Sequence, residues 1–497
     1  MCWSRSAGRA PRRTARSRAD RHRASRAGTG REALQTSQGV LGSVMANVPY
    51  PLLVTVASVL LFVLGVVLFI VGLLISIGLH ELGHLAFAKL FGVKVTQYSL
   101  GFGKAIWSFR RGETEYGIRP ILLGGYISMV GMLKPRATGR PNAISNTGMY
   151  GAFVQDARQA SAEQIADAGG DDSRAFYRLT PWKRIIVMVA GPAMNLVIGV
   201  FLFGVLLCGF GAPTTTFTSS VDCVLPTSQA TTCAPGDAES PAKRAGIRSG
   251  DVVLSVDGRQ DPTIAQVSEA FQRSAGEPVT VVVERDGARE TLEVTPALAT
   301  RDVYTPDGTV AKTEDGETKT QQVGVVGVSI GQSLVRQSPA AVLPATGAQI
   351  SASAHLIIDL PQRLVAVWNA AFGAEERSQD SPVSVVGVGR AIGEVSSMSG
   401  VPVVDKAYTI LGLLASLNIG LFVLNMVPLL PLDGGHIAGA LWEAVKRRAF
   451  RIVGKADPGP IDLAKTMPLT MVVVVLLAGM SALLIYADLV RPVDLFG

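Results

Sequence analysis

Four segments of this chain are long and apolar enough to cross the roughly 30 Å hydrocarbon core of a membrane. They are residues 51–91, 183–211, 405–428 and 468–490. The mean hydropathy of +0.33 over 497 residues is too high for an ordinary soluble protein, although only part of the chain is continuously apolar. We therefore expect a multi-pass α-helical membrane protein with four transmembrane helices and a sizeable aqueous domain.

The first of these segments carries the pattern His80-Glu81-Leu82-Gly83-His84. On a helix, residues i and i+4 share one face, so both imidazoles can bind one divalent cation while Glu81 lies beside them to activate water. With five histidines in the whole chain, this spacing rarely arises by chance. The pattern therefore favours a zinc-protease site in a membrane segment, with Glu81 as general base, over polar residues satisfied inside a helix bundle.

A catalytic zinc needs three protein ligands and an open position for water, so the two histidines require a third ligand from elsewhere in the chain. Asp433 is the favoured candidate, because Pro428 and Pro431 end the third apolar segment just before it and let its carboxylate turn into the bundle. His436 follows the same break and is the alternative.

The distribution of Lys and Arg predicts the sidedness of the connections. Both are frequent near the membrane segments in residues 92–182 and 429–467, which we expect to be cytoplasmic. The N-terminus, residues 212–404 and the C-terminus then lie outside the cytoplasm. His80 and His84 lie near the inner end of the first segment and Asp433 beyond the inner end of the third, so all three reach a similar depth near the cytoplasmic face.

Residues 1–50 form an Arg-rich extension that we expect to be disordered. Its ten Arg account for the basic character of the chain, whose formal net charge is +7, and the remainder is close to neutral. This tail gives no evidence for nucleic-acid binding. It is either a solvated arm or translated upstream sequence, with Met45 as an alternative start.

The connections have different characters. Residues 92–182 contain β-branched and aromatic runs that predict membrane-associated β-hairpins, followed by a polar, flexible loop over 134–174. Residues 212–300 predict a compact α/β module, and 301–404 a connection with helices along the membrane surface. Cys223 and Cys233 lie close together in a polar stretch and can pair as a disulfide if that stretch is outside the cytoplasm.

Several motifs together resemble the bacterial site-2 proteases, the intramembrane zinc metalloproteases of regulated intramembrane proteolysis. They are HELGH, GFG at 101–103, GGYISMVG at 124–131, AGPAMN at 190–195, the PDZ-like SPAKRAGIRSGDVVLSVDG and NMVPLLPLDGGH. The resemblance covers about residues 80–490 with gaps. It implies a four-span core, zinc bound by His80, His84 and Asp433, Glu81 as catalytic base and one PDZ domain outside the cytoplasm.

The same resemblance suggests residues that contact substrate. Asn425 carries over more safely than Asn418, whose spacing departs from the family pattern, and Gly124 and Gly125 belong to a hairpin whose edge strand can pair with an unwound substrate. For Asn195, a helix-packing hydrogen bond is favoured over active-site contact. Whether the PDZ-like module binds peptide termini or acts as a steric gate stays open.

The leading hypothesis is an intramembrane zinc endopeptidase of the cell membrane. By the family resemblance, its partners are single-span membrane proteins such as anti-sigma factors, already trimmed by an upstream site-1 protease. Clearance of remnant signal peptides and processing of a secreted peptide are alternatives within the same class. A membrane-anchored PDZ adaptor with a vestigial metal site is the alternative from another class, disfavoured because a scaffold has no reason to retain costly ionisable groups in a membrane.

Overall fold

The structure is a computed structural model. It describes residues 50–134, 149–220, 222–223, 233, 238–303, 310–312, 318–373, 377–378 and 381–493. Apart from Tyr50, the expected Arg-rich extension lies outside the described residues.

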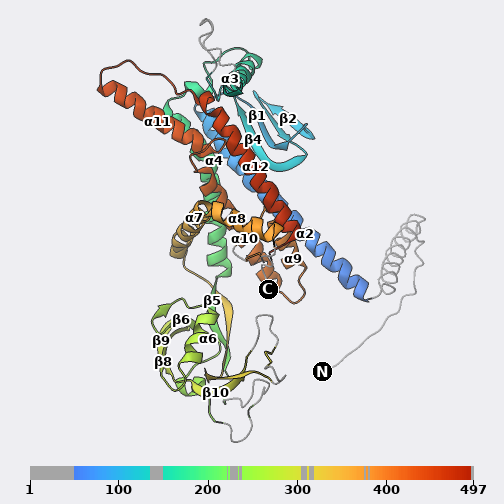
Figure 1. The fold of residues 1–497 in the computed structure, drawn as a ribbon, viewed down its shortest axis with the longest axis vertical. Coiled ribbons are helices and arrows are strands. Elements are labelled where there is room, and N and C mark those ends of the chain that lie inside the picture. Colours follow the sequence, from blue (N-terminus) through green and yellow to red (C-terminus); the bar gives the residue numbers. More distant parts are fainter. Residues whose placement is uncertain are drawn as a thin grey trace, which may run out of the picture.

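A helix bundle forms the centre of the molecule (Figure 1). Its four long helices are α2 (Tyr50–Leu90), α4 (Pro181–Gly204), α10 (Val403–Asn425) and α12 (Met467–Val490). A π-helical turn, Val205–Phe210, continues α4. These apolar runs have few charges to solvate, so a helix, which satisfies every backbone hydrogen bond internally, is the structure they can adopt in a membrane. Each of the four predicted segments corresponds to a different one of these helices.

The structure contains a fifth helical segment that is long and apolar enough to cross a membrane, Pro339–Ile358. It comprises a short 3-10 turn and α7 (Val342–Ile358), and it falls in the region expected to lie along the membrane surface. In the structure, α7 packs against α4 and α10, and the next helix, α8 (Leu360–Phe372), packs against α12. The prediction of four spans did not include this candidate segment, because its Pro, Thr, Gly, Gln, Ser and His residues give it the lowest mean hydropathy of the five.

A four-stranded sheet covers one end of the bundle (Figure 1). Its strands are β1 (Val95–Phe102), β2 (Trp107–Arg111), β3 (Thr114–Ile118) and β4 (Ile121–Met129), in the order β2-β3-β1-β4. The prediction of hairpins is correct for β2 and β3, but β1 runs parallel to β3 and antiparallel to β4. This order leaves β4 as an edge strand, packed against α2.

The polar loop expected over 134–174 contains a helix, α3 (Met149–Asp167), while residues 135–148 lie outside the described part. Ile165 of α3 is buried against Val130 and Tyr177, which explains why this segment is ordered despite its polar composition. The segment expected as a cytoplasmic loop, 429–467, likewise contains a 20-residue helix, α11 (Asp433–Ile452).

An α/β domain lies at the opposite end of the bundle (Figure 1). Its strands are β5 (Ala212–Ser220), β6 (Val252–Val256), β7 (Arg259–Gln260), β8 (Val279–Arg285), β9 (Ala288–Val294) and β12 (Val328–Val335), ordered β12-β5-β6-β8-β9 with β7 on β6. Helices α5 (Pro241–Ala245) and α6 (Ile264–Arg273) and a ribbon of β10 (Ala297–Asp302) and β11 (Thr320–Val325) complete it. The domain extends past the expected boundary at residue 300, because β12 pairs with β5. Cys223 is bonded to Cys233 in its insertion.

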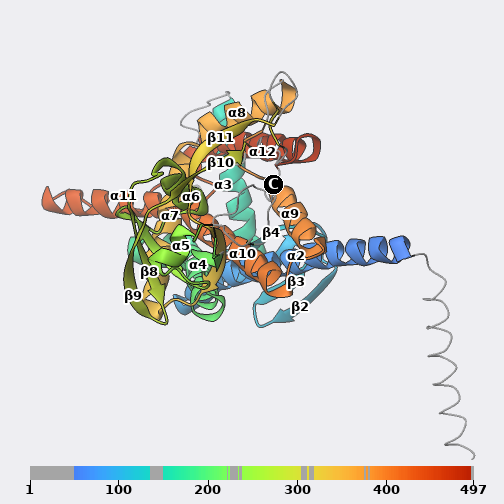
Figure 2. The same ribbon diagram turned by 90° about the horizontal axis from the view of Figure 1, so that it is seen from below.

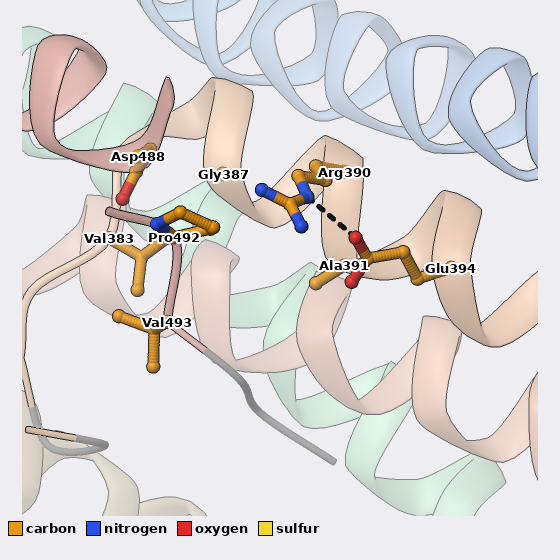
Figure 3. A pocket seen from close by; sticks show the side chains of 8 residues that line it. All are labelled: Val383, Gly387, Arg390, Ala391, Glu394, Asp488, Pro492 and Val493. Atoms are coloured by element: carbon orange, nitrogen blue, oxygen red, sulfur yellow. Dashed lines mark hydrogen bonds and ion pairs between the residues drawn. The ribbon is translucent and has the colours of Figure 1, made fainter. Parts of the chain in front are cut away.

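Helix α9 (Val385–Ser397) fills the space between α2 and the end of α12. Asp488, at the end of α12, is 2.6 Å from Arg377 and accepts a hydrogen bond of 2.7 Å from the backbone N–H of Ser384, just before α9. Figure 3 shows Asp488 beside Gly387 of α9, with the C-terminal segment at Pro492 and Val493 lying next to the helix. These contacts fix the start of α9, which reaches a cavity described below.

Candidate active site

Three donor atoms converge at the junction of α2 and α11. The Nε2 atoms of His80 and His84 are 3.2 Å apart, and the Oδ2 atom of Asp433 lies 3.4 Å from the first and 3.3 Å from the second. Four ligands at about 2.0–2.1 Å from a tetrahedral zinc lie about 3.3–3.4 Å from one another. The three atoms therefore have the spacing of three corners of a zinc site, and two imidazoles with one carboxylate are a donor set that zinc accepts.

The approach of Asp433 depends on the turn between α10 and α11. Helix α10 ends at Asn425, and Asp433 is the first residue of α11. A Cβ atom on Gly434 would lie 2.2 Å from the carbonyl oxygen of Val427, and one on Gly435 would lie 2.5 Å from the backbone nitrogen of Leu430. Because these two positions admit glycine alone, the turn folds tightly over the start of α11 and directs Asp433 towards the histidines.

Helix α4 orients both imidazoles. Nδ1 of His84 lies 2.8 Å from the carbonyl oxygen of Val187, and Nδ1 of His80 lies 3.2 Å from the side-chain amide of Asn195. With Nε2 facing the cluster, each Nδ1 carries the proton, which His84 donates to the Val187 carbonyl; the atom of Asn195 that faces His80 is the amide nitrogen, itself a donor. The Oδ1 atom of Asn195 is buried without a partner among the described residues, and turning the amide over would give His80 an acceptor.

The two helices cross at glycines beside the histidines. A Cβ atom on Gly83 of α2 would lie 2.4 Å from the carbonyl oxygen of Ala190, and one on Gly191 of α4 would lie 2.1 Å from Nε2 of His84. His84 itself is only 4% exposed. Gly191 thus belongs to the site, although the sequence analysis did not single it out within the AGPAMN motif.

Glu81 lies where two cavities meet. One, of about 310 Å³, is lined by the two histidines and Asp433 together with Met129, Met132 and Met188. The other, of about 320 Å³, is a mainly apolar slot lined by Leu73, Ile77, Leu122, Val385, Leu417 and Leu421. His80, Glu81, Gly125 and Asn425 line both. A carboxylate at this junction can reach both water at the donor triangle and a chain lying in the apolar slot.

The candidate substrate-contact residues occupy different positions. Asn425, Gly124, Gly125 and Asn195 line the apolar slot. Asn418 lines neither of the two cavities: its buried amide donates to the Ser76 hydroxyl at 3.0 Å and to the Leu414 carbonyl at 2.8 Å. Asn418 therefore joins α10 to α2. The sequence suggested instead that it contacts substrate. Asn195 is both a contact between helices and part of the site.

His436, the alternative third ligand, lies outside the donor triangle. It lines the cavity beside Asp433, and the group of metal-binding side chains found within the described residues comprises His80, His84 and Asp433. Burial lowers the pKa of His436 to about 4, so its imidazole is neutral at pH 7. The geometry therefore favours Asp433 over His436 as third ligand.

The fold and these residues define a class of protein, a zinc metalloprotease built into a bundle of membrane helices. Comparison with known proteins gives the family. The model of peptidase family M50 matches residues 68–455, so the chain belongs to this family, that of the site-2 proteases.

Three relatives agree with this assignment. The zinc metalloprotease Rip1 of Mycobacterium tuberculosis is 33% identical over 451 residues, covering 88% of this chain and all of that protein. Rip1 of Mycolicibacterium smegmatis is 32% identical over 458 residues, with the same coverage. The metalloprotease MmpA of Caulobacter vibrioides is 29% identical over 402 residues, covering 76% of this chain and 86% of that protein. The chain is a zinc metalloprotease, as the sequence predicted.

Proposed function

We propose that this protease holds its zinc with His80, His84 and Asp433 and cleaves the transmembrane segments of single-span membrane proteins. The observation that carries the proposal is the position of the donor triangle, which opens through Glu81 and Asn425 into an apolar slot between membrane helices. A slot lined mainly by Leu, Ile and Val suits the side chains of a membrane helix better than those of a soluble peptide.

Glu81 is the general base of the proposed reaction. It takes a proton from the attacking water and delivers it to the leaving nitrogen of the peptide. Zinc supplies the Lewis acidity that makes water nucleophilic at neutral pH and polarises the peptide carbonyl. Val187, and Asn195 when its amide is turned so that the oxygen faces His80, keep the imidazoles in the tautomer that leaves both Nε2 atoms free for the metal.

The substrate must unwind before it is cut, because a membrane helix satisfies its own backbone hydrogen bonds. The edge strand β4 offers replacement partners, since it is paired with β1 on one side only and passes the slot at Gly124 and Gly125. A Cβ atom on Gly125 would lie 2.9 Å from Ile77 and 3.0 Å from Glu81. The glycine thus lets the strand approach the catalytic carboxylate closely, and an added substrate strand would run beside Glu81.

Anti-sigma factors that an upstream protease has already trimmed are the proposed physiological substrates. In this proposal the α/β domain is the PDZ-like filter that admits trimmed proteins, and the zinc site faces the cytoplasm. Clearance of remnant signal peptides uses the same chemistry and differs only in substrate. The adaptor alternative is disfavoured, because the three donor atoms keep metal-site spacing and Glu81 lies beside them.

The test is cleavage of a purified single-span substrate by the protein in lipid vesicles, with the cut mapped by mass spectrometry. We expect a cut within the transmembrane segment. We also expect about tenfold slower cleavage when helix-weakening Gly and Pro residues near the cut are replaced by Leu, which makes unwinding costlier. A matched substrate with the same replacements far from the cut serves as control. Cleavage outside the span, or equal rates for all three substrates, would contradict the proposal.

A further inference from the structure

Helix α11 leaves the bundle sideways after supplying Asp433. Its first half packs against α4, whereas its second half projects away from the other helices, as both views show (Figures 1 and 2). The helix has 20 residues, Asp433–Ile452, which makes it about 30 Å long. Nothing in the proposed reaction requires so long an extension beyond its first residue.

The projecting half exposes one apolar face. Trp442, Val445 and Ile452 are 63%, 58% and 77% exposed, and their spacing puts them on the same side of the helix. Leu441 and Val453 widen this face and are also exposed. A soluble surface rarely keeps a tryptophan and several aliphatic side chains together in this way, so the face indicates a partner.

The face lies at the depth where a membrane begins. Trp442 and Gly439 of α11 line an apolar cavity of about 200 Å³ together with Leu469 and Thr470, which lie in the first turn of α12. Helix α12 belongs to a segment, Leu463–Val490, long and apolar enough to span a membrane, so we expect the boundary between lipid and water near its first turn. Tryptophan is enriched at this boundary because one part of its ring is apolar and its N–H is polar.

Cations accompany the apolar face. Lys446, Arg448 and Arg451 are exposed, and within the described residues none of them forms an ion pair with a carboxylate. The acidic residue of this stretch, Glu443, is fully buried and paired with Arg184 and Arg447. Lys446 follows Trp442 by one turn, on the side of the apolar cavity. The outer half of α11 is thus apolar on one side, with Lys446 and Arg448 at the two edges of that face and Arg451 on the opposite side.

We propose that α11 is an interfacial helix with a binding site for anionic phospholipid, in the membrane leaflet next to the zinc site. An acyl chain occupies the cavity at Trp442, and the phosphate headgroup contacts Lys446. Arg448 and Arg451, on other sides of the helix, add positive charge that attracts anionic headgroups. The position of Trp442 and the cations without a carboxylate partner favour a lipid over a soluble protein, because Lys and Arg beside an apolar face extend their charges to the headgroups.

Lipid binding has a consequence for catalysis, which rests on the proposed zinc ligands. Asp433 is the first residue of the same uninterrupted helix, so a lipid that fixes the tilt of α11 also fixes the direction from which the carboxylate approaches the histidines. Anionic lipid is therefore expected to increase the rate of peptide cleavage.

The test measures quenching of Trp442 fluorescence by brominated lipid, taken as the difference between the wild type and Trp442→Phe. The vesicles contain phosphatidylcholine, with about a third replaced by phosphatidylglycerol where stated. In separate samples, either the phosphatidylglycerol or the phosphatidylcholine is brominated. We expect the binding constant at Trp442 to be at least about fivefold larger for phosphatidylglycerol than for phosphatidylcholine. One cation at a membrane surface supplies about this factor.

The variant K446E/R448E/R451E is expected to lose this preference. The control R244E/R259E/R289E reverses three exposed cations of the α/β domain and is expected to keep it. Zinc content equal to wild type shows that the first variant folds.

Equal quenching by the two brominated lipids would overturn the lipid site, and so would an unchanged preference for phosphatidylglycerol in K446E/R448E/R451E. The absence of any quenching, together with self-association of the protein through this face, would also overturn it. If the lipid preference is found while no vesicle supports peptide cleavage, the proposed function fails and the lipid site stands.

Discussion

At the scale of single residues, the site depends on how closely α2 and α4 approach. His84 is held between the Val187 carbonyl and the backbone of Gly191, so the imidazole has one position and one tautomer. The HExxH pattern revealed the ligands because their chemistry is tied to helical spacing. Gly191 was not predicted, because its role is to leave room for His84 of α2. The sequence does not show which residue lies opposite a glycine.

The first prediction concerns Gly191→Ala. The added methyl group would lie 2.1 Å from Nε2 of His84 and must displace the imidazole, so we expect zinc content to fall well below one per chain. Metal analysis of the purified protein measures it. Gly204→Ala, in the same helix, is the control, because nothing lies within 4 Å of the added atom and its zinc content should not change. Full zinc content in Gly191→Ala would contradict this account of the crossing.

The second prediction separates the two buried asparagines. Asn195 contacts His80, so Asn195→Ala should weaken zinc binding by about 10–100-fold, as loss of a hydrogen bond to a metal-binding histidine does. Asn418→Ala removes a contact to Ser76 and should lower the free energy of unfolding while leaving zinc affinity unchanged. Competition with a chelator measures both affinities. Equal losses of affinity in the two variants would show that Asn195 acts only in helix packing.

At the scale of elements, α11 joins the zinc site to the bundle through a buried ion pair. Glu443 of α11 is 0% exposed, pairs with Arg184 of α4 and accepts a hydrogen bond of 3.0 Å from the backbone N–H of Ile461. The prolines before Asp433 correctly predicted the end of α10. The helix that follows was expected as a loop, because the residues it buries are small or charged, such as Ala440 and Glu443, and give no apolar stripe in the sequence.

The third prediction tests this ion pair. Glu443→Gln keeps the size of the side chain but leaves Arg184 buried without its main counter-charge, which should cost about 3–5 kcal/mol in the free energy of unfolding. Thermal unfolding in detergent measures the change. Glu394→Gln is the control: it breaks the exposed pair with Arg390 seen in Figure 3 and should cost about 0.5 kcal/mol or less. Similar unfolding temperatures for the two variants would contradict the prediction.

At the scale of the whole molecule, the sheet of β1–β4 and the α/β domain lie at opposite ends of the bundle (Figure 1). The membrane class and the four longest helices could be predicted because a lipid-spanning helix needs a long apolar run. The fifth candidate segment, α3 and the extent of the α/β domain could not. These elements are held in place by contacts between residues far apart in the sequence, such as the pairing of β12 with β5 across more than a hundred residues.

The fourth prediction concerns topology. A phosphatase reporter that is active only outside the cytoplasm should be active when inserted after Gln260, in the α/β domain. It should be inactive after Gly112, in the turn between β2 and β3. Both positions are exposed, so the insertions should leave expression unchanged. A reporter active at Gly112 and silent at Gln260 would invert the proposed orientation and put the zinc site near the outer face.

The most direct test of the central claim is the zinc content of the purified protein, measured by mass spectrometry, together with cleavage of a single-span substrate. Wild type and Glu81→Gln should each hold about one zinc per chain, and only the wild type should cleave. Asp433→Ala should lose both zinc and activity. Equal cleavage by wild type and Glu81→Gln, or a full zinc content in Asp433→Ala, would contradict the proposed site.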